Sequence, residues 1–408
     1  MRGGAKLGAE IPEGYKDTKV GVIPEEWGVV KLEGICDRIT DGSHSSPKEN
    51  CDEGYKIATV ANMGYNGFDL DSCKSISKQE YEQLVRNGCN PNIGDILFSK
   101  DGTVGLCFVH KQNASLVLLS SIAIISPKKG VLDPDFGSYV LKSALVLRRI
   151  TGQKTGSAIS RIVLKDLKKI RILLPSPPEQ RKIATILCSV DDAIQETGAI
   201  ISQTEQVKRG LMQELFTKGI GHTEFQDTKI PDGWRSCKLD NIIDLVYGSG
   251  LSEANRMPGF SPVYGSNGII GYHENALVKG PGIIIGRKGS IGEVTWCNED
   301  FWPIDTTYYV KTKSNINLKW IYFSLILLNI KRLNSATGIP GLNRSDILSL
   351  RVFVPPLPEQ RKIASILSSV DEKLEAERGH RAQLETMKKG LMQNLLTGKK
   401  RVKVDDHA

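Results

Sequence analysis

One helix-forming segment occurs twice in this chain. Residues 175–217 and 355–397 align without a gap at an offset of 180, and 22 of the 43 aligned positions are identical. The identities gather at both ends, where PPEQRKIATIL matches LPEQRKIASIL and KRGLMQELFT matches KKGLMQNLLT. Any fold of this chain must therefore accommodate two long elements whose ends are alike and whose centres differ.

Both copies have the features of an uninterrupted α-helix. Pro178 and Pro358 stand in the first turn, where a missing N–H leaves no bond unmade. Glu179 and Glu359 follow, where a carboxylate favours the positive end of the helix dipole. Apolar side chains then recur in alternating steps of four and three residues, which is typical of a coiled coil. In the first copy this heptad seam runs through Ile183, Leu187, Val190, Ile194, Leu211 and Leu215.

Two helices of equal length and pattern in one chain most simply pair with each other. The segment between them is long enough to fold back, which favours an antiparallel pair over two unrelated surface helices. If the two helices overlap along their full length, seam residues whose numbers sum to 578 face each other. In that register, Lys388 comes within reach of Asp191 and Lys208 within reach of Asp371.

The same register assigns a role to two glycines inside the helices. Gly210 would face Ser368, and Gly390 would face Cys188. A glycine inside a helix costs up to ~1 kcal/mol relative to alanine. We therefore expect these glycines to permit a close approach of the two helices.

A stretch rich in β-branched residues and glycine precedes each helix. The two stretches open alike, with DTKVGVIPEEW at 17–27 and DTKIPDGW at 227–234, and then diverge. We expect an α+β protein with two globular mixed α/β domains, joined by two long helices that form an antiparallel coiled coil with pseudo-twofold symmetry. The expected boundaries are 1–174 and 220–354 for the domains, 175–219 and 355–398 for the helices, and 399–408 for a basic tail.

Composition narrows the class of protein. The chain is 408 residues long, which suits two or more domains. Its eight cysteines include no C-x-x-C pair, which argues against a zinc site or a disulfide framework. No apolar run reaches the ~18 residues of a membrane span, and the start lacks the apolar core of a secretory signal, so we expect a cytoplasmic protein. The formal charge of +8 favours a polyanionic partner.

Several motifs carry a family resemblance. They are the P-x-P-E-Q-R-K-I-A helix start, the DTK…IP…W opening, ITDGSHSSP at 39–47 and GSNGIIGY at 265–272. In these motifs and their order, over nearly the whole chain, the protein resembles the specificity subunit of type I restriction–modification enzymes. One departure is Ser176-Pro177 in the first copy, where the second has Pro356-Leu357.

The resemblance implies a function and partners. It implies two target-recognition domains that read a double-stranded DNA site in two parts, separated by an unread spacer. It also implies assembly with two methyltransferase (modification) subunits, and with restriction subunits in the full complex. S-adenosylmethionine is then expected in the partner methyltransferase subunit, with no cofactor in this chain.

Catalysis by the chain itself has no support in the sequence. The G-x-x-x-x-G-K-[ST] phosphate loop and the N/D-P-P-Y/F motif of amino-methyltransferases are both missing, and the six histidines never cluster at the spacing of metal ligands. We expect a non-catalytic subunit with no metal site. Two alternatives stay open: an enzyme with an unrecognised site, and a coiled-coil adaptor that binds only proteins. Methylation assays with and without the partner, and salt-dependent DNA binding, would separate the three.

Polar and cationic side chains on glycine-flanked loops are the candidates for DNA contact. Glycine lets the backbone approach a groove, and base edges are read by such side chains. The candidates in the first domain are Ser43, His44, Ser45, Ser99, Lys100, Thr103, Ser157, Ser160 and Arg161. Those in the second are Tyr264, Ser266, Asn267, Arg287, Lys288, Ser290, Asn343 and Arg344. We expect Trp27 and Trp234 to pack the domain openings instead of stacking on bases.

The repeated helix ends supply candidates for the methyltransferase docking surface. A partner that binds twice would need the same residues twice, away from the heptad seam. The candidates are Gln180, Arg181, Lys182, Met212 and Gln213 in the first copy, and Gln360, Arg361, Lys362, Met392 and Gln393 in the second. Ordinary solvation of a helix surface is the competing explanation.

Overall fold

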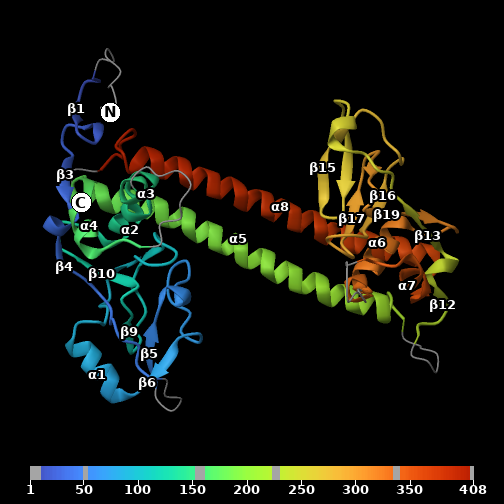
Figure 1. Ribbon diagram of the computed structural model, residues 1–408, viewed down its shortest axis with the longest axis horizontal. Coiled ribbons are helices and arrows are strands. Elements are labelled where there is room, and N and C mark those ends of the chain that lie inside the picture. The colour runs from blue at the N-terminus through green and yellow to red at the C-terminus, as the bar shows by residue number, and fades with distance from the viewer. Residues whose placement is uncertain (1–10, 49–53, 152–160, 223–229, 334–340, 405–408) are drawn as a thin grey trace. The chain divides into compact units, whose positions relative to one another are not determined.

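The computed structural model describes residues 11–48, 54–151, 161–222, 230–333 and 341–404 (Figure 1). Contacts divide the chain into two compact units, which are described separately. Unit 1 comprises Met1–Glu196 and Arg381–Ala408, and unit 2 comprises Thr197–His380. Each unit therefore contains half of each long helix.

The long helices are α5 (Pro177–Thr217) and α8 (Leu357–Leu395). In unit 1 the beginning of α5 packs on the end of α8, because Ile183 and Leu187 share a buried cluster with Leu395. In unit 2 the end of α5 packs on the beginning of α8, where Leu215 and Ile363 share another. The two helices are therefore antiparallel in each unit, as the repeat predicts.

Two ion pairs confirm the predicted register. The Lys388 ammonium lies 2.6 Å from the Asp191 carboxylate in unit 1. In unit 2 the Lys208 ammonium lies 2.5 Å from the Asp371 carboxylate. Because a shift by one heptad would separate both pairs by about 10 Å at ~1.5 Å per residue, these contacts fix the alignment.

The first of these pairs also ties the first domain to the helices. The hydroxyls of Tyr65 and Tyr139 donate to Asp191 at 2.6 and 2.7 Å. Burial alone would raise the pKa of Asp191, but the hydrogen bonds from Lys388 and the two tyrosines hold that pKa below its usual value. Asp191 therefore remains ionised as an acceptor for three donors.

The predicted role of the helix glycines is wrong. A Cβ atom added at Gly210 or Gly390 would meet no atom within 4 Å. Both glycines precede a seam leucine and lie on the exposed side of their helix. Close approach of the helices therefore does not account for either glycine.

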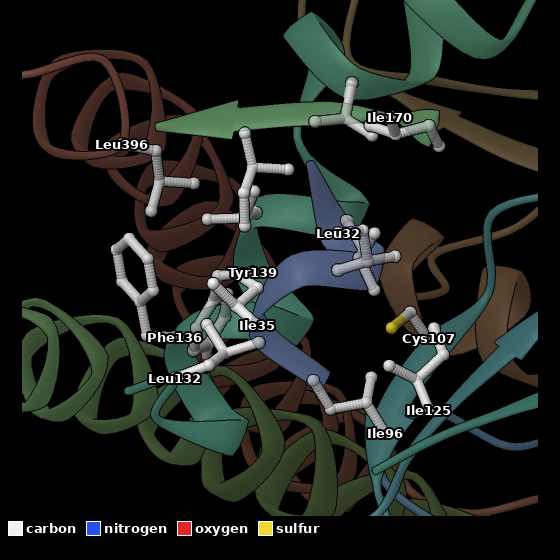
Figure 2. Packing of buried hydrophobic residues seen from close by; sticks show 14 of the residues in the cluster. Leu32, Ile35, Ile96, Cys107, Ile125, Leu132, Phe136, Tyr139, Ile170 and Leu396 are labelled. Carbon is white, nitrogen blue, oxygen red and sulfur yellow. The ribbon is translucent and has the colours of Figure 1, made fainter. Parts of the chain in front are cut away.

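Unit 1 contains one four-stranded antiparallel sheet and several smaller elements. The sheet has the order β4-β10-β7-β8, and α2 packs on β7 and β8. Its elements are β1 (Tyr15–Thr18), β2 (Gly21–Pro24), β3 (Gly28–Lys31), β4 (Cys36–Asp41), β5 (Tyr55–Ala58), β6 (Lys74–Ile76), α1 (Lys78–Arg86), β7 (Ile96–Ser99), β8 (Cys107–Val109), β9 (Leu116–Leu118), β10 (Ile122–Pro127), α2 (Pro134–Lys142), α3 (Ala144–Thr151), α4 (Leu164–Lys169) and β11 (Arg171–Leu174). Figure 2 shows part of the apolar cluster, to which the sheet contributes Ile96 and Ile125, α2 contributes Phe136, and Leu396 follows α8.

Unit 2 repeats this plan with another sequence. Its four-stranded sheet has the order β13-β19-β16-β17, which matches β4-β10-β7-β8 strand for strand. Its elements are β12 (Arg235–Lys238), β13 (Ile243–Tyr247), β14 (Ser261–Gly265), β15 (Gly268–His273), β16 (Gly282–Gly286), β17 (Val294–Cys297), β18 (Trp302–Pro303), β19 (Thr307–Thr312), α6 (Leu318–Leu327), α7 (Arg344–Ser349) and β20 (Arg351–Val354). A small β12–β20 pair corresponds to β3–β11 in unit 1.

A glutamate at the start of each long helix anchors the domain opening. Trp27 is 1% exposed and donates its indole N–H to Glu179 at 3.0 Å. Trp234 is 5% exposed and donates to Glu359 at 3.0 Å. Arg401, in the basic tail, also donates to Glu179 at 2.6 Å. These contacts confirm that both tryptophans pack the openings.

The part of the chain that the structure describes contains neither a candidate membrane-spanning helix nor a candidate metal-binding cluster. None of its helices combines the length and the apolar character needed to cross a bilayer. Within the same residues, no group of three or more His, Cys, Asp and Glu side chains is placed to hold a metal ion.

Candidate nucleic-acid interface

A glycine loop connects equivalent strands of the two sheets. Residues 100–106 join β7 to β8, and residues 287–293 join β16 to β17. Gly102 and Gly289 have φ of 72° and 78°, and the glycines three residues later also have positive φ. Because only glycine adopts these angles without strain, the shared spacing produces the same turn twice.

Lys100 lies inside the unit 1 loop. Its N–H donates to Ser121 O at 2.9 Å, and its own carbonyl accepts from Ile162 N–H at 2.7 Å. The side chain is 2% exposed, and its ammonium lies 3.0 Å from Asp41. Lys100 does not present a cation at the surface, and this placement gives its predicted DNA contact no support. Its charge is neutralised by Asp41 at the end of β4, which lies two strands away from β7 in the sheet.

Arg287 occupies the equivalent position in unit 2. Its N–H donates to Thr306 O at 2.9 Å, and its carbonyl accepts from Leu342 N–H at 2.9 Å. Its guanidinium carbon lies 5.1 Å from the ring centroid of Tyr247, and Nη2 donates to Asp305 O at 3.0 Å. Its Nε is buried without a hydrogen-bond partner among the described residues. The same backbone therefore holds a partly exposed arginine over an aromatic ring here.

Tyr247 is the counterpart of Asp41. Each ends the sheet strand that pairs with β10 or β19, and each is followed by glycine and serine, as DGS at 41–43 and YGS at 247–249. The N–H groups of Ser43 and Ser249 then donate to carbonyls at 2.7 and 2.9 Å in matching positions. Our sequence reasoning missed Tyr247. The shared G-S pair at an offset of 206 is the signal that could have found it.

Two further candidates in unit 1 are buried turn residues. Ser43 is 7% exposed, and its hydroxyl donates to Ser45 O at 2.7 Å. Ser99 is 0% exposed, and its hydroxyl donates to Thr103 O at 2.6 Å. Both side chains are used in closing their own loops. Their burial gives the predicted DNA contacts of Ser43 and Ser99 no support.

The remaining candidates in unit 1 differ in accessibility. His44, Ser45 and Thr103 are exposed. Arg161 is exposed and lies 3.3 Å from the Asp101 carboxylate. Ser157 and Ser160 lie outside the described residues. These exposed side chains, beside the two glycine-rich turns, remain the candidates of this unit.

In unit 2 the structure brings five candidates together around the Arg287 loop. Ser266 donates to Thr306 O at 2.8 Å, beside the Arg287 backbone. Ser290 donates to Asn267 Oδ1 at 3.3 Å, and Lys288 is exposed. The cluster formed by Ser266, Asn267, Arg287, Lys288 and Ser290, together with Tyr247, is called the Arg287 cluster below.

Three candidates of unit 2 make contacts inside their own domain. Tyr264 is 6% exposed and packs in an apolar cluster, which gives its predicted DNA contact no support. Asn343 caps α7 by accepting from Ser345 N–H at 3.2 Å. Arg344 donates to Leu245 O at 2.7 Å and pairs with Asp244. The guanidinium of Arg344 is therefore engaged inside its own domain.

Part of the predicted docking surface is buried. Gln180 and Gln360 are 0% and 3% exposed, and each accepts a backbone N–H at the start of a domain helix at 2.9 Å. Met212 is 5% exposed in the core of unit 2. Gln180, Gln360 and Met212 contact their own domains, and their burial gives the predicted docking role no support. The exposed members are Arg181, Lys182, Gln213, Arg361, Lys362 and Gln393, and Met392 is half-buried.

Nearly the whole chain is similar to known proteins. Residues 24–206 and 231–386 match the family model described as type I restriction modification DNA specificity domain. The putative type I restriction enzyme MjaX specificity subunit of Methanocaldococcus jannaschii is 27% identical over 96% of this chain and 97% of its own. The MjaVIII specificity subunit of the same organism is 25% identical, with the same two coverages.

Solved structures share the fold. The type I restriction–modification S subunit from M. genitalium aligns with a TM-score of 0.66 and 19% identity, over 91% of this chain and 96% of that one. A chain from a structure on complex assembly and conformational transition of the type I R-M system aligns with a TM-score of 0.55 and 16% identity, over 93% and 99%. These likenesses confirm the predicted fold class.

Proposed function

The chain belongs to the type I restriction–modification DNA specificity family, and on that premise we propose that it reads a bipartite DNA site. Each domain reads one half-site, and the bases between the half-sites are not read. The chain is a specificity subunit and carries out no methylation or cleavage itself. The methyltransferase subunits that it positions supply the S-adenosylmethionine chemistry.

One observation carries this proposal. The two units share a strand order, a glycine-loop backbone and a helix repeat, yet the side chains on equivalent loop positions differ, as Lys100 and Arg287 do. A common scaffold with unlike loops suits two reading heads with unlike targets. The formal charge of +8 adds the sequence-independent attraction to phosphates on which DNA binding rests.

The Arg287 cluster is the proposed reader of the second half-site. Arginine forms bidentate hydrogen bonds with guanine, and serine and asparagine read base edges as well. Lys288 is exposed one residue further on, where a cation suits a phosphate contact. In the first domain the reading residues are among His44, Ser45, Thr103 and Arg161, because Lys100 is already paired.

The proposed partners follow from the repeated helices. Two methyltransferase subunits dock on this chain, one for each copy of the repeat, and restriction subunits join through them in the full complex. The exposed cations Arg181, Lys182, Arg361 and Lys362 are the proposed common part of these two docking surfaces.

Reconstitution tests the proposal. The purified chain should transfer no methyl group, and adding the methyltransferase subunit should produce methylation at one bipartite sequence with a two-to-one subunit ratio. Replacing residues 235–350 with the matching segment of another family member should change one half of the methylated sequence and leave the other half intact. A replacement that alters both halves would show that the domains read one continuous site.

The two competing functions are tested by the same preparation. Methyl transfer by the rigorously purified chain alone would make it an enzyme. A chain that binds the methyltransferase subunit but shows no salt-dependent binding to DNA would be a protein adaptor.

A further inference from the structure

Unit 1 has an apolar groove at the end of α8. The groove has a volume of about 760 Å³ and lies between the β1–β2 hairpin, the junction of α2 and α3, and the last turn of α8. Val20 and Val22 come from the hairpin, Leu145 from α3, and Met392 and Leu396 from α8 and the residue after it. Val22 is 46% exposed, so this apolar surface is open to solvent.

Four cations surround these apolar walls. They are Lys142, Arg148, Lys389 and Lys399, and no aspartate or glutamate lines the groove among the described residues. A ligand that fills the groove therefore needs an apolar surface and negative charges at its edges. Nucleic acid lacks the first of these, because its backbone presents phosphates that would have to lose water against valine and methionine.

An amphipathic protein helix meets both requirements. Such a helix lays apolar side chains at positions i, i+3 or i+4 and i+7 into a groove of the partner. Acidic residues beside that apolar face would then lie next to the lysines and arginine. The charge pattern therefore selects an acidic protein segment over DNA and over a basic helix.

The two copies of the repeat differ at this position. Met392 lines the groove, whereas Met212, its counterpart 180 residues earlier, is 5% exposed in the core of unit 2. Gln393, the next residue of the repeated motif, also lines the groove and is exposed. The second copy of the motif thus offers an apolar side chain that the first copy has buried in its own unit.

We propose that this groove binds an amphipathic segment of the methyltransferase subunit, with one apolar face and acidic residues along its edges. The inference rests on the proposed function and adds the chemistry of the partner segment. It also makes the two docking sites unequal, because the methionine that lines the groove in unit 1 is closed off in unit 2.

A pair of substitutions at Gln393 tests the sign of the charge. Gln393→Glu and Gln393→Lys change one exposed side chain in opposite directions. The glutamate variant should bind the purified methyltransferase subunit about tenfold more weakly at low salt, and the lysine variant as tightly as the native chain or more tightly. The difference should shrink as salt is added. A lysine variant that binds more weakly than the glutamate variant would overturn the proposal.

A second variant tests the apolar contact. Val22→Ser removes methyl groups from an exposed strand residue and should weaken binding about fivefold at any salt concentration. Thermal unfolding of each variant checks that unit 1 stays folded. Lys165→Glu, at an exposed position of α4 outside the groove, is the control that should bind like the native chain. Unchanged binding by Val22→Ser and both Gln393 variants would show that the partner docks elsewhere.

Binding of the native chain to the methyltransferase subunit distinguishes a failure of the groove assignment from a failure of the proposed function. If the native chain forms no complex with the methyltransferase subunit, the proposed function fails and the groove assignment fails with it. If the native complex forms and every groove variant binds equally well, only the groove assignment fails.

Discussion

The glycine loops of the two units have the same backbone and hold a basic side chain in two different ways. Lys100 is enclosed at 2% exposure with Asp41 at 3.0 Å. Arg287 lies over the exposed ring of Tyr247, with its guanidinium carbon 5.1 Å from the centroid. The shared backbone fixes where the side chain begins, and the residue that ends β4 or β13, two strands away, decides whether that side chain is buried or remains at the surface.

This difference follows from the chemistry of the two partners. An ammonium is compact and strongly hydrated, so burying it requires an opposite charge close by. A guanidinium is planar and weakly hydrated, so it stacks on an aromatic ring and keeps donors for another acceptor. A basic residue in such a glycine loop is therefore available to a DNA partner only when the facing strand residue leaves it accessible.

The largest effect is expected from removing the partner of the buried lysine. Asp41→Asn leaves the Lys100 ammonium enclosed without its 3.0 Å partner. The loss should be roughly 3 kcal/mol in the free energy of unfolding, at the lower end for a broken buried pair, because Asp101 remains 3.7 Å away. Denaturant unfolding measures it. The double variant Asp41→Asn/Lys100→Met should recover most of the loss, and an Asp41→Asn chain of native stability would contradict the buried-pair description.

The next largest effect concerns the proposed reading of DNA by Arg287. Arg287→Ala should weaken DNA binding by about 1–3 kcal/mol and relax only the second half-site, because a bidentate contact to guanine is lost. Sequencing of methylated sites, with the methyltransferase subunit present, measures it. The matched variant Lys100→Met should leave the first half-site sequence unchanged. If Arg287 contacts only phosphate, binding would instead weaken evenly and the salt slope would fall by about one.

The pairing and register of the repeated helices were predictable from sequence, whereas the burial of single loop side chains was not. Heptad spacing is a local property of the chain, so it sufficed to predict the register and the Lys388–Asp191 pair. Whether Lys100 is buried depends on Asp41, 59 positions away in sequence and adjacent only after the sheet has formed. That information is not contained in the loop itself.

The identical residues at the helix ends also had two possible explanations in the sequence. Identical residues at both ends suggested a partner bound twice, but Gln180 and Gln360 each hold the start of a domain helix of this same chain. Both explanations predict identical residues at an offset of 180. Only the folded domains distinguish them, because burial of the glutamine depends on the segment that packs over it.

A third expected effect tests whether the two loops really share a backbone. Gly102→Ala and Gly289→Ala each force a side chain into positive φ, at 72° and 78°, in space where a Cβ atom would meet no other atom within 4 Å. Each should therefore lose about 1–2 kcal/mol of stability from backbone strain alone. The two losses should agree within ~0.5 kcal/mol, and thermal unfolding of each variant measures them. Losses that differ by more than this would mean that the loops are held differently.

The smallest effect expected isolates the contribution of the aromatic ring. Tyr247→Ala removes the surface on which the Arg287 guanidinium lies, whereas Tyr247→Phe keeps it. The alanine variant should lose about 0.5–1 kcal/mol in binding to the native DNA site, which is the usual value of an exposed cation–π contact, and the phenylalanine variant should bind nearly as the native chain does. Titration of fluorescent DNA measures both.

A double variant tests whether the Tyr247 ring affects DNA binding only by positioning Arg287. If Tyr247 only positions Arg287, then Tyr247→Ala should cause no further loss in a chain that already carries Arg287→Ala, because interacting residues are not additive. An additional loss in the double variant would assign the tyrosine its own contact with DNA. Since Asp41 occupies the equivalent strand position in unit 1, where it neutralises its cation, only the second domain should show this coupling between strand residue and half-site sequence.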